Sequence, residues 1–266
     1  MITIQIASDF HIEYKENLSS PDIDPDPLEY ITPTGDVLVL AGDIGSLYKL
    51  KQLHTFLEKL VPHFQAVIYI PGNHEYYVPH TNDRESSTTT YLNMHVLEER
   101  LKSLSETIPR LYILDRDSIR IGDVCIAGCT LWSSPRCIIP KYIVRIHGMT
   151  TEYYTRRHYQ DVVYIENISK YCKNKGYKLL MVTHYPPSIR VLEGTNKKSK
   201  FYSLYATELE DSMVTKEKGV DVWVSGHIHK NFDFITDGKS RLLGNQRGKP
   251  RDKITDYKKD FILTFL

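Results

Sequence analysis

Short apolar runs recur along the chain, and polar or helically spaced segments separate them. Several, such as VLVLA at 37–41 and LLMVT at 179–183, are apolar at successive positions. This is typical of strands covered on both faces, since a strand with one wet face alternates apolar and polar residues. The runs predict strands at 2–7, 37–41, 66–70, 118–121, 124–128, 179–183, 220–225, 232–236, 241–243 and 261–265.

Helical spacing of apolar residues appears between the early strands. The leucines that show it within 47–60 are Leu50, Leu53, Leu57 and Leu60. We predict an amphipathic helix there and two more over 94–104 and 160–173. Strands and helices alternate first, whereas the later strands follow one another closely, which indicates crossovers and then hairpins. The predicted fold is α/β: a layered two-sheet β-sandwich flanked by helices.

Composition is that of an ordinary globular protein. The chain has 266 residues, 41% hydrophobic and 25% charged, with a formal net charge of +1. We expect a single domain over 1–266 and no global attraction to nucleic acid or an anionic membrane. Four cysteines without a C-x-x-C pair predict reduced thiols. With neither a signal peptide nor a membrane-spanning run, a cytoplasmic protein is expected.

Polar side chains that suit metal binding follow the predicted strands in ASDFH, LAGDIG, IPGNHE, VTHYPP and VSGHIH. They are Asp9, His11, Asp43, Asn73, His74, His184, His227 and His229. Strand ends are where open α/β sheets bind ligands. Oxygen and imidazole donors without thiolate suit Mn, Fe, Zn or similar divalent ions. The donors are too many for one ion, so we predict two metals, an arrangement that clamps displacement at phosphorus.

Each motif taken singly also has a structural explanation. A lone Asp or His at a strand end is commonly a cap or a loop residue, and Asp43 precedes the predicted helix over 47–60. GNHE and GHIH are more specific because several possible ligands adjoin a glycine turn. The occurrence of all five motifs in one chain favours the metal site.

In this order, the motifs resemble the calcineurin-like metallophosphoesterase superfamily, especially its single-domain bacterial and viral members. That family's pattern is D-x-H, G-D, G-N-H-E/D, a later His and G-H-x-H. The matching residues are Asp9-Phe10-His11, Gly42-Asp43, Gly72-Asn73-His74-Glu75, His184 and Gly226-His227-Ile228-His229. The resemblance spans residues 9–229.

The resemblance implies a role for each matching residue. The implied metal ligands are Asp9, His11 and His229 for one ion, Asn73, His184 and His227 for the other, and Asp43 as a bridge. His74 would stabilise the phosphoryl oxygens or protonate the leaving group, and Glu75 would support its loop. A hydroxide bridging the metals would attack phosphorus in line, without a covalent phosphoenzyme.

The implied activity is metal-dependent hydrolysis of phosphoric esters, on a phosphorylated small molecule or nucleotide. After Gly42-Asp43 the chain continues Ile44-Gly45-Ser46, without the arginine of protein phosphatases. This favours a phosphodiester over a phosphomonoester substrate. A phosphomonoesterase and a non-catalytic metal-binding module that keeps the fold are the alternatives.

Contacts with the substrate are less defined. A substrate cap is expected as an insertion around 134–160, and the candidate contacts are Arg156, Arg157, Tyr185 and Arg247. For Arg156 and Arg157, a solvated helix charge is an equally good explanation. Basic residues within 249–259 alternate with acidic ones, which favours a solvated surface over a nucleic-acid patch.

Overall fold

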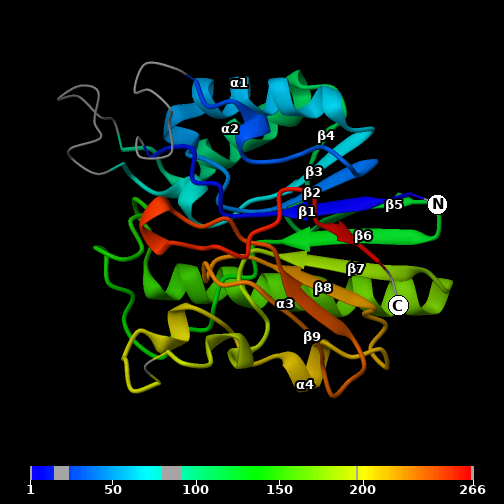
Figure 1. Cartoon of the computed structure of the whole chain (residues 1–266). Coiled ribbons are helices and arrows are strands. Elements are labelled where there is room, and N and C mark those ends of the chain that lie inside the picture. The colour runs from blue at the N-terminus through cyan, green and yellow to red at the C-terminus, as the bar shows by residue number, and fades with distance from the viewer. Residues whose placement is uncertain (1, 15–23, 80–90, 196, 265–266) are drawn as a thin grey trace.

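The computed structural model describes residues 2–14, 24–79, 91–195 and 197–264 (Figure 1). Its strands are β1 (Ile4–Ala7), β2 (Val37–Ala41), β3 (Ala66–Ile70), β4 (Leu111–Ile113), β5 (Asp117–Ile121), β6 (Val124–Cys129), β7 (Lys178–Thr183), β8 (Val222–Ser225), β9 (Phe232–Ile235), β10 (Arg241–Gly244) and β11 (Ile262–Leu263). Its helices are α1 (Leu50–Leu60), α2 (Met94–Thr107), α3 (Thr151–Lys175) and α4 (Glu210–Met213).

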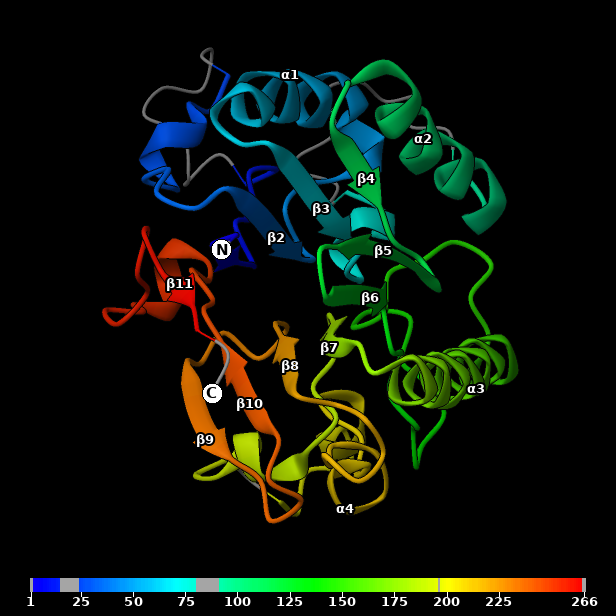
Figure 2. The ribbon, with the colours of Figure 1, turned by 90° about the vertical axis from the view of Figure 1, so that its right-hand side faces the viewer.

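These strands form two sheets that stack between outer helices, as Figures 1 and 2 show. One sheet has the order β11-β1-β2-β3-β4 and the other β5-β6-β7-β8-β10-β9. Neighbours among β1 to β4 are parallel, and so are those in the run β6, β7, β8 and β10. Antiparallel strands flank them. The predicted two-sheet sandwich with flanking helices is confirmed.

Alternate residues of the central strands enter two different apolar cores. In β2, Val37 and Val39 belong to the core between the two sheets, together with Val182 of β7. Leu38 and Leu40 belong to the outer core, which includes the apolar face of α1. Both faces of the strand are therefore covered, which explains why its residues are apolar at successive positions.

The structure differs from the sequence-based elements in several places, including the short α4, which was not predicted, and shifted ends of α2, β8 and β11. Strand β4 was not predicted, because its three residues are too few to show a pattern and Tyr112 is exposed. The predicted helix over 47–60 begins with a 3-10 turn, and α1 starts at Leu50. Helix α3 begins at Thr151, well before 160, and Thr150 caps it by accepting a hydrogen bond from the Tyr153 amide. Part of the expected 134–160 insertion is thus helical.

Two further expectations concern the thiols and membranes. The four cysteines are free in the structure, and Cys125, Cys129 and Cys172 are buried. None of the described helices combines the length and the apolar character needed to cross a bilayer.

Candidate metal centre

The side chains of the five motifs lie together beyond the ends of five strands in two sheets. In one sheet, β1, β2 and β3 are neighbours in parallel, and the loops after them carry Asp9, Asp43 and Asn73. In the other, Thr183 at the end of β7 pairs with Ser225 at the end of β8, so His184 and the 227–229 loop begin side by side. The stacking of the sheets brings the two groups into contact.

An unusual backbone conformation marks this region. The ligand candidates with positive φ are Asp9 (57°), His11 (50°), Asp43 (54°), His227 (75°) and His229 (49°). Residues other than glycine rarely adopt this conformation, and its clustering points to a functional constraint. Space is also limited, because a Cβ atom on Gly72 would lie 2.3 Å from Asp43 Oδ1.

The first group of donors is built around two imidazoles. The Nε2 atoms of His11 and His229 lie 2.9 Å apart, and His229 Nε2 lies 3.3 Å from Asp9 Oδ1. The other ring nitrogens contact carboxylates, with His11 Nδ1 3.1 Å from Glu13 and His229 Nδ1 2.5 Å from Asp252. Burial lowers the pKa of His229, but Asp252 and Asp9 outweigh it and raise that pKa to about 9, so without a metal His229 is protonated and its Nε2–H points toward His11 Nε2. A divalent cation can replace this proton between the two Nε2 atoms, because metal binding releases protons from its ligands.

The second group has the same character. His184 Nδ1 lies 2.9 Å from the carbonyl of the last residue of β2, so it donates its N–H there. Its Nε2 faces Asn73 Oδ1 at 2.9 Å and Asp43 Oδ1 at 3.3 Å. His227 Nδ1 lies 3.3 Å from the same Nε2 atom. Asp43 belongs to both groups, since its Oδ2 is 3.6 Å from His11 Nε2.

The electrostatics of these groups also fit a cation. Asp9 and Asp43 are buried. Burial alone would raise the pKa of Asp43, but His184 and the other nearby histidines hold it well below its usual value. Burial lowers the pKa of His184, yet Asp43 and Asp9 outweigh it and raise that pKa to about 9. Without metal, a proton on His184 supplies the positive charge, so the donor set fits divalent ions.

Glu75 holds the loops that carry the ligands. Its buried carboxylate accepts hydrogen bonds from the amides of Asp43 (3.1 Å), Ile44 (2.7 Å) and Gly72 (2.7 Å) and from the Tyr69 hydroxyl (2.6 Å). It therefore ties the turn after β2 to the turn after β3. The prediction that Glu75 supports this loop is confirmed.

The segment after β10 supports His229. Gln246 Oε1 accepts a hydrogen bond from the His229 amide (2.7 Å), and its Nε2 donates to the Lys230 carbonyl (2.8 Å). Asp252 accepts from His229 Nδ1 and from the Lys249 amide. The motifs did not reveal Asp252, because its position depends on how a distant loop folds back over the site.

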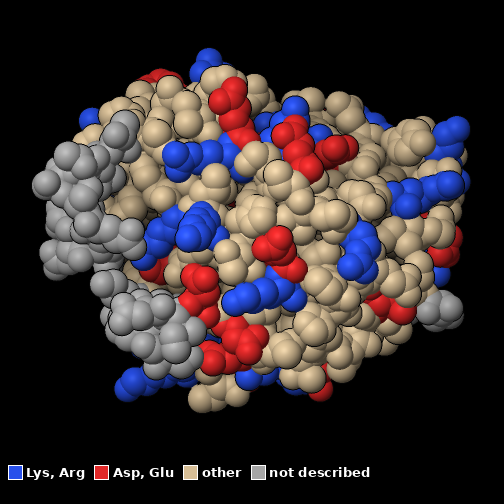
Figure 3. Space-filling view, turned by 90° about the horizontal axis from the view of Figure 1, so that it is seen from above, with Lys and Arg blue, Asp and Glu red and all other residues tan. Residues whose placement is uncertain are grey.

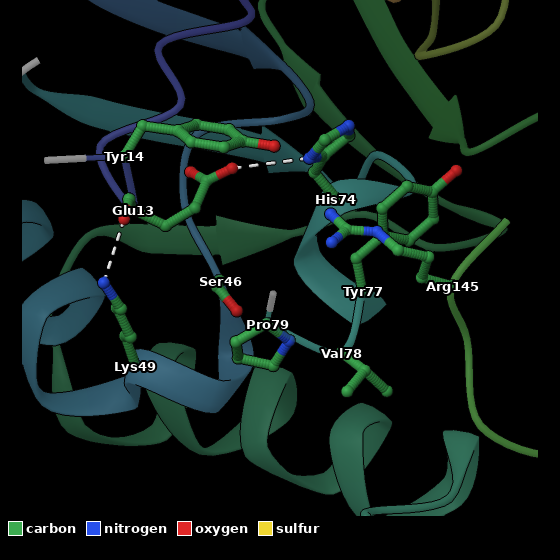
Figure 4. A pocket seen from close by; sticks show the side chains of 9 residues that line it. All are labelled: Glu13, Tyr14, Ser46, Lys49, His74, Tyr77, Val78, Pro79 and Arg145. Atoms are coloured by element: carbon green, nitrogen blue, oxygen red, sulfur yellow. Dashed lines mark hydrogen bonds and ion pairs between the residues drawn. The ribbon is translucent and has the colours of Figure 1, made fainter. Parts of the chain in front are cut away.

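His74 lies in a small pocket beside the metal ligands (Figure 4). Its amide donates to Asp43 Oδ1 at 2.8 Å, and its Nδ1 lies 3.4 Å from Glu13 Oε1. Its Nε2 lies 3.4 Å from Lys249 Nζ. Burial lowers the pKa of His74 to about 4, so the imidazole is neutral near pH 7. The pocket is lined by Glu13, Tyr14, Ser46, Lys49, His74, Tyr77, Val78, Pro79 and Arg145.

Lys249 corrects one expectation from the sequence. Basic residues after 248 were expected on a solvated surface, but Lys249 is only 9% exposed and its Nζ lies 5.1 Å from the centre of the Tyr14 ring. The turn at Gly248, with a φ of 68°, directs the chain toward the site. Elsewhere charges of both signs are mixed, as on the face seen in Figure 3.

The proposed substrate contacts occupy different places. The Tyr185 ring lies 3.9 Å from that of His227, so Tyr185 packs against a metal-ligand candidate. Arg157 is buried and contacts Glu98 and Asp115. The other two guanidinium groups lie over tyrosine rings, Arg156 over Tyr153 and Arg247 over Tyr30. The structure thus brings Tyr185 to the ligands and places the Arg157 guanidinium in an internal ion pair.

Comparisons with known proteins agree with this geometry. The family model described as calcineurin-like phosphoesterase matches residues 2–231. An uncharacterized protein of Acanthamoeba polyphaga mimivirus is 24% identical over 259 residues, which cover 90% of this chain and 88% of that protein.

Solved structures show the same fold at low identity. The phosphopantetheinyl hydrolase of Mycobacterium tuberculosis has a TM-score of 0.68 at 16% identity, covering 96% of this chain and 93% of that one. A dimetal phosphatase from Danio rerio has a TM-score of 0.53 at 12% identity, covering 91% and 86%. On the match of the family model to most of its length, this chain belongs to the calcineurin-like phosphoesterase family.

Proposed function

We propose that this protein is a metal-dependent phosphoesterase that uses two divalent cations and prefers phosphodiesters to phosphomonoesters. The observation that carries the proposal is the convergence of nitrogen and oxygen donors from five strand ends on two adjoining groups that share Asp43. Such donors suit Mn, Fe or Zn. Membership of the family supports a phosphorylated substrate. We propose that this substrate is a small molecule or a nucleotide.

Each cation would have its own ligands and one in common. The proposed set is Asp9, His11 and His229 for the first, Asn73, His184 and His227 for the second, and Asp43 for both. Such ions, when bound, activate water and neutralise phosphoryl oxygens. The chain itself contributes orientation: Glu13 and Asp252 hold His11 and His229 in the tautomer that presents Nε2.

His74 would act on the leaving group or on a phosphoryl oxygen. Its ring is held between Glu13 at Nδ1 and Lys249 at Nε2, so it is fixed in orientation before substrate arrives. The Lys249 ammonium lies on the side of Nε2 and supplies positive charge and a proton there. With its N–H directed to Glu13, the neutral imidazole carries no proton on Nε2, so a proton for the departing oxygen would reach Nε2 from the Lys249 ammonium, and water would then reprotonate Lys249.

The preference for a diester rests on the turn after β2. The Asp43 turn continues through Ile44, whose amide bonds Glu75, to Ser46, which lines the His74 pocket. No arginine stands in this turn to bind the extra charge of a phosphomonoester. A phosphodiester carries less negative charge than a phosphomonoester, so the absence of this arginine weakens its binding less.

Hydrolysis assays test the proposal directly. Metal-stripped protein reloaded with Mn²⁺ should cleave bis(p-nitrophenyl) phosphate faster than p-nitrophenyl phosphate. His74→Ala should lower turnover while keeping the metal content, and Asp43→Asn should lower both. Faster cleavage of the monoester would reverse the substrate preference. No activity with Mn, Fe or Zn would refute the enzyme and leave a metal-binding module.

We also propose a cytoplasmic location, supported by the buried free thiols of Cys125, Cys129 and Cys172. Thiols of this kind remain reduced in the cytoplasm. Alkylation of denatured protein taken from its native host should modify all four cysteines, whereas a disulfide would argue against this location.

A further inference from the structure

Arg145 lies where the His74 pocket opens into a larger groove. Val78, Pro79 and Arg145 line both spaces. The groove measures about 780 Å³, and its wall includes the apolar side chains of Ile139 and Met149. A substituent on a phosphate held at His74 would pass Arg145 before it reached the groove.

The guanidinium of Arg145 lacks an anionic partner within the part of the chain that the structure describes. Its Nη1 atom is buried and has no hydrogen-bond acceptor there. By contrast, Arg116, Arg157, Arg190 and Arg241 each contact a carboxylate. A buried charged donor without an acceptor is costly, so a ligand that supplies anionic oxygens would be favoured here.

The surroundings of Arg145 place it against the ring that contacts His74. Its carbonyl accepts a hydrogen bond from the Val78 amide (2.7 Å), and its guanidinium carbon lies 5.5 Å from the centre of the Tyr77 ring. The Tyr77 ring in turn lies 4.5 Å from the His74 ring. Figure 4 shows the guanidinium beside Tyr77, on the side of the pocket that faces His74. Arg145 is therefore one side chain farther out than the residue that would contact the scissile phosphate.

A second cation already serves the position next to His74. Lys249 Nζ contacts His74 Nε2, so charge on the scissile phosphate has a partner without Arg145. The planar guanidinium can bind two phosphate oxygens at once, which an ammonium cannot do. The two cations thus suit two neighbouring anionic groups.

We propose that Arg145 binds a second phosphoryl group, joined to the scissile one, so that the substrate is a diphosphate or longer polyphosphate ester. This inference rests on the proposed function for the place of the scissile phosphate. The groove beyond Arg145 would accept the organic part of the substrate.

Binding of AMP and of ADP, the latter as its non-hydrolysable α,β-methylene analogue, to the Mn²⁺-loaded protein, measured by calorimetry, tests this subsite. Arg145→Met should weaken ADP binding about 10- to 100-fold and AMP binding less than about threefold. Arg136→Met is the matched control, because it also removes a guanidinium, but from an exposed arginine that lines a separate cavity and lies 4.0 Å from Glu208. It should leave both affinities within about twofold. Metal chelation by the nucleotides is equal for all variants and cancels.

Two results would overturn the subsite: equal weakening of ADP and AMP in Arg145→Met, or no weakening of ADP. If Arg145→Met does not fold, Arg145→Lys replaces it and should lose about tenfold in ADP affinity, since an ammonium lacks the fork. Failure of the proposed function would appear separately, as absence of ester hydrolysis by wild-type protein, while calorimetry still decides the role of Arg145.

Discussion

Two clusters of charged side chains in the described part of the chain differ in how their charges are paired. The metal centre gathers Asp9, Asp43 and several histidines at the strand ends. The other cluster joins α2 and α3 to the loop before β5. Its residues are Glu98, Asp115, Arg116, Arg157 and Asp161.

In the second cluster the chain supplies its own cations. Arg157 contacts Glu98 and Asp115, and Arg116 Nη1 lies 2.7 Å from Asp161 Oδ1. In the metal centre, potential metal ligands face one another, as the Nε2 atoms of His11 and His229 do. The carboxylates of the second cluster have guanidinium partners within the chain, whereas the nitrogen and oxygen donors of the metal centre face one another and can take up a cation in place of protons.

Asp43→Asn is the change expected to have the largest effect on this contrast. The substitution removes the negative charge common to both donor groups, and we expect turnover to fall on the order of 1000-fold. Bound metal, measured by elemental analysis of the purified protein, should fall with it. Full metal content together with full turnover would show that Asp43 is not shared.

Arg157→Met disrupts the second cluster instead. It leaves Glu98 without its cation and Asp115 with Arg116 alone, and the free energy of unfolding should fall by about 3–5 kcal/mol. Metal content and turnover of the folded protein at low temperature should not change. Arg156→Met is the matched control, because the Arg156 side chain is exposed, unlike that of Arg157. It should shift stability by less than about 0.5 kcal/mol. Lost turnover with unchanged unfolding would instead give Arg157 a role in substrate binding.

The contrast also explains what the sequence could predict. Asp43 and Asn73 follow apolar strands and adjoin glycine turns, so their place at a sheet edge is encoded locally. Lys249 and Arg145 come from loops far from His74 in the chain, and only the packing of those loops brings them near it. Arg157 looked equal to Arg156 in the sequence because the helix face that each occupies depends on where α3 begins. Local patterns thus predicted the ligand candidates but not the pocket around His74.

The pH dependence of stability probes the second cluster further. Asp161 is fully buried, and burial together with Asp115 raises its pKa to about 6, although Arg116 opposes the shift. A raised acid pKa means that the folded protein holds the proton more tightly than the unfolded chain. The stabilisation is therefore complete below about pH 4 and is lost as pH rises through 6.

Asp161→Asn should remove this loss. Relative to the variant, wild-type protein should lose up to about 3 kcal/mol of unfolding free energy between pH 4 and pH 7. Urea unfolding of both proteins across this range measures the difference, and titration elsewhere in the chain affects both alike. Parallel stability curves would contradict the raised pKa.

Gln246→Ala should have the smallest of these effects, and that effect should be confined to the metal centre. Gln246 fixes the His229 amide but would not touch a cation, so its loss should loosen one ligand and lower the affinity of the first site about tenfold. The second group, with His184 and His227, does not contact Gln246 in the described structure, and its affinity should stay the same. Metal titration followed by calorimetry separates the two sites. Lys230→Ala, which keeps the carbonyl that Gln246 bonds, is the control. Equal weakening of both sites would contradict this prediction. It would mean that Asp43, which belongs to both groups, transmits the loss of Gln246 from the first site to the second.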